Sequence, residues 1–167
     1  MESPEKEKIL SETISTQSLP DYEALGALWA ILTNAANLMQ GESECNLNRE
    51  RIISLVGKLS EEDIKRLLRD KSVDSLVFLD PPLETVLAGP DEKPDEDSIM
   101  RIIGKVRSSR DSDPGEALIN LVEILGRIHD KSVHWFKTGP GPQDNEVLSA
   151  ARKILYLLCI LAVSKLD

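Results

Sequence analysis

The stretch from Glu116 to His134, EALINLVEILGRIHDKSVH, decides the fold. Read at about 100° per residue, its apolar side chains gather on one face of a helix. That face consists of Leu118, Leu121, Val122, Leu125 and Ile128. The opposite, polar face consists of Asn120, Glu123, Arg127, Asp130, Lys131 and His134. The pattern predicts an amphipathic helix that buries one side against the rest of the chain.

A second stretch, Ile154 to Val163 (ILYLLCILAV), is apolar except for one tyrosine hydroxyl. A helix that is apolar all round is buried on all sides. We therefore expect the rest of the chain to pack around these two helices. A run of this length is well short of the roughly 18–20 residues needed to cross a bilayer, so no membrane contact is expected.

Composition limits the classes of function. The 167 residues suit a single domain, and the 41% of hydrophobic residues suffices for a core. The net charge of −9 argues against broad binding to a nucleic-acid backbone, although it leaves room for a small basic site. Aromatic residues make up only 4%, which argues against a platform for stacking bases.

The cysteines and histidines do not suggest a metal or a cofactor. Cys45 and Cys159 form no CxxC pair and no cluster with histidine, so we expect no zinc site and no cofactor. The charged N-terminal segment does not resemble a signal peptide, and a cytoplasmic location is expected largely by default.

The remaining pattern predicts an all-α protein, an antiparallel helical bundle. We expect a flexible N-terminal arm over residues 1–19, in which Lys6 to Ser15 could form a short helix, and a single α-helical domain over residues 20–167. Further helices are expected over Tyr22–Gln40, Leu47–Leu59, Glu96–Ser108 and Asn145–Lys165. Another is expected to begin at Ser60, where the sequence resembles a capping box. Residues 71–80 suit either a short helix or a buried extended segment, and Pro90 to Asp97 is expected to form an exposed loop.

Two further features have competing interpretations. Trp29 could be a functional aromatic residue, but core packing is the favoured role. The segment Arg101 to Arg110 carries four basic residues and no acidic one. It is either a solvated helix face near a helix C-terminus, which we favour, or a local phosphate-binding patch.

Arg127 and His134 are the best candidates for chemistry. They are seven residues apart and therefore lie only about 20° apart around the helix axis. An imidazole of near-neutral pKa can take or give a proton, and a guanidinium can stabilise charge on phosphate oxygens. This pair suits attack on a phosphodiester of RNA, whose 2′-hydroxyl supplies the nucleophile. The alternative is a surface arginine paired with Glu123 or Asp130, beside a surface histidine at a helix C-terminus. We expect His129 to be a core or interface histidine.

These residues carry a resemblance to a known family. The motif Arg127-x6-His134, followed by a Gly/Pro loop and the helix VLSAARKILYLLCILAV, resembles the HEPN superfamily. The chain is most similar there to the C-terminal domain of abortive-infection proteins. The opening helix ALGALWAILTNAANLM also fits. The resemblance implies a HEPN-like bundle, a homodimer with Arg/His clefts at its interface, and metal-independent endoribonuclease activity of a toxin or antiphage effector.

In that reading Arg127 would stabilise the phosphate, and His134 would be the acid and base. Asn120, Asp130 and Lys131, which share the polar face, are predicted to contribute to binding. The chain has Ile128 where active members of the superfamily usually have a polar residue, and Trp135 where glycine often follows the histidine. The second hypothesis is therefore a non-catalytic interaction or regulatory module that dimerises or binds a protein partner or a nucleotide.

Overall fold

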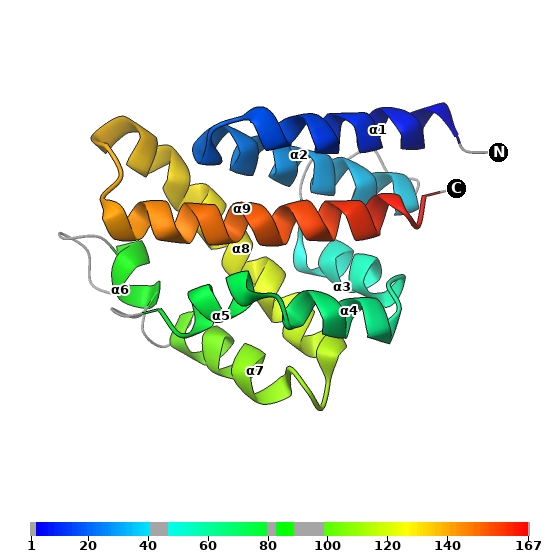
Figure 1. Cartoon of the computed structure of the whole chain (residues 1–167). Helices are drawn as coiled ribbons and strands as arrows, with labels where there is room; N and C mark the ends of the chain where they lie inside the picture. Colours follow the sequence, from blue (N-terminus) through cyan, green and yellow to red (C-terminus); the bar gives the residue numbers. More distant parts are fainter. Residues whose placement is uncertain (1–2, 41–46, 80–82, 89–98, 167) are drawn as a thin grey trace.

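The computed structural model describes residues 3–40, 47–79, 83–88 and 99–166, and within these ranges the chain is helical and has no strand (Figure 1). The prediction of an all-α protein is confirmed. The helices are α1 (Pro4–Ser15), the 3-10 helix η1 (Thr16–Ser18), α2 (Asp21–Gln40), α3 (Arg49–Gly57), α4 (Glu61–Leu68), α5 (Lys71–Val77), α6 (Leu83–Ala88), α7 (Arg101–Ser109), α8 (Pro114–Thr138) and α9 (Pro142–Val163). The expected loop from Pro90 to Asp97 lies outside the described residues.

Local capping explains where several helices begin and end. The side chain of Ser60 accepts a hydrogen bond from the Asp63 amide at 3.2 Å, which confirms the expected start of α4. The helix α8 starts after Asp113, whose carboxylate accepts from the amide of Glu116. It ends at Gly139, whose φ of 85° is readily adopted by glycine. Residues 71–77 form a short helix, which resolves the ambiguity of that segment.

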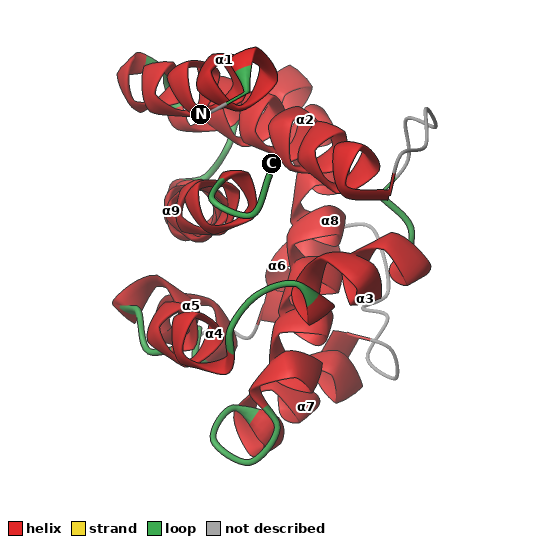
Figure 2. Ribbon diagram, turned by 90° about the vertical axis from the view of Figure 1, so that its right-hand side faces the viewer, coloured by secondary structure: helices red, strands yellow, loops and turns green. Residues whose placement is uncertain are grey.

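The helix α9 packs between two groups of helices. Figure 2 shows it almost end-on, with α1 and α2 on one side and α4 and α5 on the other. Two contacts give the relative direction of α9 and α2. Arg152 bonds to Asp21, and Cys159 bonds to the carbonyl of Leu28, so in both contacts the residue of α9 is 131 positions later in the sequence than its partner in α2. The two helices therefore run parallel. The expectation of antiparallel neighbours is wrong for this pair. Short loops make consecutive helices antiparallel, but α2 and α9 are separated in the sequence by α3 to α8, so no short loop determines their relative direction.

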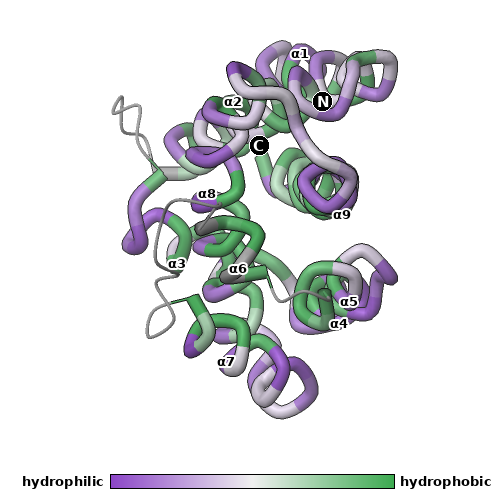
Figure 3. Tube along the Cα trace, turned by 90° about the vertical axis from the view of Figure 1, so that its left-hand side faces the viewer, coloured by the Kyte–Doolittle hydropathy of each residue, from purple (hydrophilic) through white to green (hydrophobic). Residues whose placement is uncertain are grey.

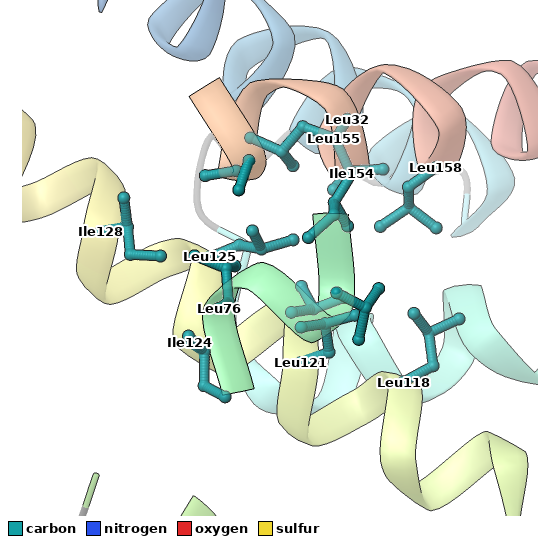
Figure 4. Packing of buried hydrophobic residues seen from close by; sticks show 14 of the residues in the cluster. Leu32, Leu76, Leu118, Leu121, Ile124, Leu125, Ile128, Ile154, Leu155 and Leu158 are labelled. Carbon is teal, nitrogen blue, oxygen red and sulfur yellow. The ribbon is translucent and has the colours of Figure 1, made fainter. Parts of the chain in front are cut away.

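The core confirms the apolar face predicted for α8. All five residues of this face are fully inaccessible to solvent. The expectation that the run Ile154 to Val163 of α9 is buried on all sides is wrong, because the neighbouring helices leave its outer side open and its Tyr156, Leu157, Ile160 and Leu161 are partly exposed. In Figure 4 leucines and isoleucines of α8 lie opposite those of α9, with Leu32 of α2 and Leu76 of α5 completing the layer. Hydrophilic residues gather on the outer turns of α1, α4 and α5 (Figure 3). The buried cluster includes residues from each of α1 to α9.

The N-terminal segment is not the loose arm expected for residues 1–19. Helix α1 packs against α9 and α2, and it buries Ile9 and Thr13. The hydroxyl of Thr13 donates to the carbonyl of Ile9, so its burial leaves no unsatisfied donor. The alternative of a short helix in this segment is confirmed.

The bounds of α8 and α9 also differ from expectation, and one helix was not expected. Helix α8 continues through Trp135 and Phe136 to Thr138, one turn beyond the predicted end. Helix α9 begins at Pro142 rather than Asn145, because proline is well suited to the first turn of a helix. Helix α6 was not expected at all. Among the described residues, none of the helices combines the length and apolar character that crossing a membrane requires.

The basic segment at α7 lies largely on an exposed helix face, as the favoured interpretation predicts, and two of its arginines also hold α7 against α5. Arg107 donates to the carbonyl of Val77, and Arg110 bonds to Asp74 at 2.6 Å. Both guanidinium groups also lie over the ring of Phe78, at 4.8 and 5.9 Å from its centroid. These contacts attach α7 to the C-terminal end of α5, where cations are favoured.

Candidate functional site

Arg127 and His134 lie on one side of α8, as predicted. Both belong to the same uninterrupted helix, so their Cα atoms are about 10 Å apart along the axis and about 20° apart around it. His134 is exposed to solvent and Arg127 is partly buried. One helix thus presents one guanidinium and one imidazole along a single stripe.

The predicted binding residues differ in accessibility. Lys131 lies one turn from each of the two and is partly buried, and Asp130 is exposed. Asn120, by contrast, is only 1% exposed, and its amide donates to the backbone carbonyl of Glu116 at 2.8 Å. The prediction that Asn120 belongs to the exposed polar face is wrong, because several other helices pack against α8 and bury more of its circumference than its apolar face alone.

The two acidic residues proposed as local partners of Arg127 have other contacts. Glu123 forms an ion pair with Arg49 of α3, and this pair connects two helices that are distant in the sequence. Asp130 lies 3.7 Å from the Nδ1 atom of His129. Each of these two acids thus contacts a residue other than Arg127.

His129 is an interhelical histidine, as expected. Its ring stacks on Trp29 of α2, with centroids 5.4 Å apart and planes 16° from parallel. Two turns further along, Phe136 stacks on Tyr22 at 4.4 Å. The order of these pairs shows that α2 and α8 run antiparallel. Trp29 is partly buried against the core, which confirms its predicted packing role.

Burial lowers the pKa of His129 below its ordinary value, and the nearby carboxylate of Asp130 offsets only part of this effect. The imidazole is therefore mainly neutral near pH 7. Since it lies against the indole of Trp29 and not beside His134 on the polar stripe, its geometry suits packing between helices.

A polar groove of about 700 Å³ lies elsewhere, on the outer side of α9, between η1 and α5. Its lining includes Arg152, Lys153, Glu146, Ser149 and Tyr156, but neither Arg127 nor His134. Sequence analysis missed this feature because its walls come from three segments far apart in the chain. No local pattern in the sequence indicates it.

Neither possible metal ligands nor known relatives point to a function. Within the described residues, no three His, Cys, Asp or Glu side chains gather closely enough to hold a metal ion. Comparison of the chain with protein-family models, with curated proteins and with solved structures yields no match. The functional argument therefore depends on the chain's own residues.

Proposed function

We propose that the protein is a metal-independent endoribonuclease of the HEPN type, which acts as a homodimer through Arg127 and His134. The observation that supports this proposal is the shared, solvent-facing stripe of α8, which presents a guanidinium and an imidazole with Lys131 between them. These groups match the needs of RNA cleavage, in which charge develops on phosphate oxygens while protons move.

In this proposal the RNA supplies the nucleophile. The 2′-hydroxyl attacks the adjacent phosphorus, the bond to the 5′-oxygen breaks, and the products are a 2′,3′-cyclic phosphate and a 5′-hydroxyl. His134 takes the proton from the 2′-hydroxyl or returns one to the leaving oxygen. Arg127 stabilises the negative charge on the phosphate.

In this proposal the second protomer supplies the second imidazole. One α8 helix presents a single imidazole, whereas cleavage uses both a base and an acid. A twofold axis beside α8 would bring two Arg127/His134 pairs into one cleft, because an isologous contact places the same surface patch of both subunits together. The exposed Val133, next to His134 on the same helix, provides apolar area that such a contact could bury.

The test is cleavage of fluorescently labelled RNA in EDTA by the wild type, His134→Ala, Arg127→Lys and a Lys137→Ala control. Loss of a general acid or base typically lowers a rate by about 10²–10⁴-fold, so His134→Ala should lose most activity. Arg127→Lys should also be impaired, since lysine cannot hold phosphate in a bidentate manner. Lys137 is exposed one turn beyond Val133, and its variant should cleave like the wild type.

A non-catalytic interaction module is the second candidate. It is favoured by the exposure of Phe136, of which 64% is accessible. It is also favoured by the departures from the superfamily motif at Ile128 and Trp135, the residues that follow Arg127 and His134. Analytical ultracentrifugation together with the cleavage assay separates the two candidates. A dimer without cleavage of structured or unstructured RNA would support the module, and a monomer at all concentrations would contradict the homodimer in both.

A further inference from the structure

A second hollow of the surface lies between α3, α4 and the first turns of α8, and we call it the α3–α8 cleft. Its volume is about 510 Å³. Its apolar lining consists of Ile53, Val56, Leu59, Ile64 and Ile119. Ile53 is 47% exposed and Ile119 is partly exposed, whereas the other three are buried. The cleft therefore presents isoleucine side chains to solvent between three helices.

The charged groups that line the α3–α8 cleft are acidic. Among the described residues, the lining includes Glu61, Asp113 and Glu116 but no lysine or arginine. The carboxylate of Asp113 accepts from the amide of Glu116, and the carboxylate of Glu116 accepts from the side-chain amide of Asn120. Both donors are neutral, and neither carboxylate forms an ion pair with a described residue. Glu61 pairs with Lys65 of its own helix, but an exposed pair of this kind is weak and readily exchanged.

The outer face of α7 has the complementary character. Arg101 and Lys105 are exposed and lie on one side of the helix, because residues four apart are neighbours on a helix surface. The other two cations of this segment, Arg107 and Arg110, are held against α5. Arg101 and Lys105, by contrast, form no ion pair with a described residue. Met100, directly before the helix, is 52% exposed, so apolar surface lies beside these two cations.

The two surfaces of one chain face different directions. Ile102, Ile103 and Val106 bury the inner side of α7, which packs along α8. Arg101 and Lys105 lie on the outer side and therefore point away from α8, whose first turns form one wall of the cleft. A single chain cannot close this contact on itself, but two copies can make it.

From this complementarity we infer that the outer face of α7 of one copy docks in the α3–α8 cleft of a second copy. The cations of α7 pair with the carboxylates of the cleft, and Met100 buries apolar surface against Ile53. A second copy is the occupant that the chain itself supplies, since Arg101 to Arg110 carries four basic residues and no acidic one. The net charge of −9 does not prevent this contact, because charges more than about 8 Å apart are largely screened at physiological ionic strength. The contact does not involve the α8 stripe of Arg127 and His134, and it is independent of RNA cleavage.

The first experiment follows the self-association of the ¹⁵N-labelled full chain by NMR and by sedimentation velocity, over concentrations up to the millimolar range. The amide signals of residues 53–64, 100–108 and 112–119 should move together with one dissociation constant. A chain that stays monomeric would overturn the proposal and leave the cleft to a basic partner protein. Shifts confined to residues 127–137 would also overturn it, since they belong to the contact proposed for RNA cleavage.

Charge reversal makes the test specific. The first variant is Arg101→Glu/Lys105→Glu, and the second is Glu61→Lys/Glu116→Lys. Each should associate with itself at least about tenfold more weakly than the wild type, because attraction becomes repulsion. An equimolar mixture of the two should restore association, because the intact cleft of the first variant accepts the intact α7 of the second. If the second variant does not fold, the ¹⁵N-labelled first variant titrated with unlabelled wild type should show the shifts at residues 53–64 that it lacks alone.

Matched controls separate this contact from general effects of charge and hydrophobicity. Lys8→Glu/Lys71→Glu makes the same change in net charge as the first variant, at exposed positions outside both surfaces, and should associate like the wild type. Met100→Ser should weaken association about fivefold, because it removes apolar surface that the contact buries. Ile14→Ser changes a residue that is 50% exposed on α1, and it should have no effect. An equal loss in the controls, or no restoration in the mixture, would overturn the proposal.

Discussion

The contact between Gly126 and Trp29 gives a prediction that isolates the packing of α2 on α8. A Cβ atom added at Gly126 would lie 3.0 Å from the Cη2 atom and 3.4 Å from the Cζ2 atom of Trp29. The indole also stacks on His129, one turn further along α8. The indole therefore has little space to move away, and glycine at this position allows the two helices to approach closely.

Two opposing effects decide the outcome of Gly126→Ala. Replacing glycine by alanine within a helix stabilises by about 1 kcal/mol. Overpacking a well-filled contact costs about 1–3 kcal/mol. We expect a net loss of about 1 kcal/mol in the free energy of unfolding. For a chain of this size, that loss lowers Tm by about 2–4 °C.

Gly104→Ala is the matched control. Gly104 lies within α7, is exposed, and has no neighbouring atom within 4 Å of the added Cβ position. This variant should be more stable than the wild type by about 1 kcal/mol. Urea unfolding followed by circular dichroism at 222 nm measures both variants, and they should differ by about 2 kcal/mol.

A double-mutant cycle provides the stricter test. In a Trp29→Leu background the smaller side chain relieves the contact, so Gly126→Ala should become neutral or stabilising. Equal stabilisation by Gly126→Ala and Gly104→Ala in the wild-type background would refute the reasoning. It would mean that the indole moves aside without cost.

Three further predictions concern charge and burial. Arg152→Ala removes one ion pair and two carbonyl contacts, so the free energy of unfolding should fall by about 1–3 kcal/mol in urea titrations; an unchanged midpoint would contradict the role of Arg152 in holding η1. The pKa of His129 in the folded chain is lower than its ordinary value of 6.5. The neutral imidazole therefore contributes to stability above pH 6.5, and this contribution is lost as the pH falls through the pKa that His129 has in the folded chain. His129→Gln should flatten the decline in Tm between about pH 7 and 5, and an unchanged slope would exclude this cause. Burial raises the pKa of Cys159 to about 12, so in a Cys45→Ser chain iodoacetamide should label it only after unfolding, and rapid labelling of the native chain would contradict its burial.

The sequence predicted the features that depend on local periodicity. The five residues predicted for the apolar face of α8 repeat at helical spacing, and all five are buried. The start of α4 was predicted from Ser60, because a capping side chain acts within three residues of its own position. Arg127 and His134 were placed on one stripe for the same reason, since helical geometry alone fixes their relation.

Features that depend on how helices dock could not be predicted in this way. The burial of Asn120 follows from how neighbouring helices pack against α8, which a helical projection of α8 alone does not contain. The parallel direction of α2 and α9 requires knowledge of the path between them. The groove combines Ser72 and Lys153, which lie in different helices and have no common sequence pattern. Helix α8 includes Trp135 to Thr138 because the residue that ends it, Gly139 with its positive φ, follows Thr138.

The central claim is tested most directly by RNA cleavage in EDTA, with wild type and His134→Ala compared at equal concentration and with equal helical content by circular dichroism. The proposal predicts cleavage by the wild type, 2′,3′-cyclic phosphate ends on the products, and a loss of at least about 10²-fold in the variant. Cleavage that persists unchanged in His134→Ala, or no cleavage by the wild type on several structured and unstructured RNAs, would contradict the assignment.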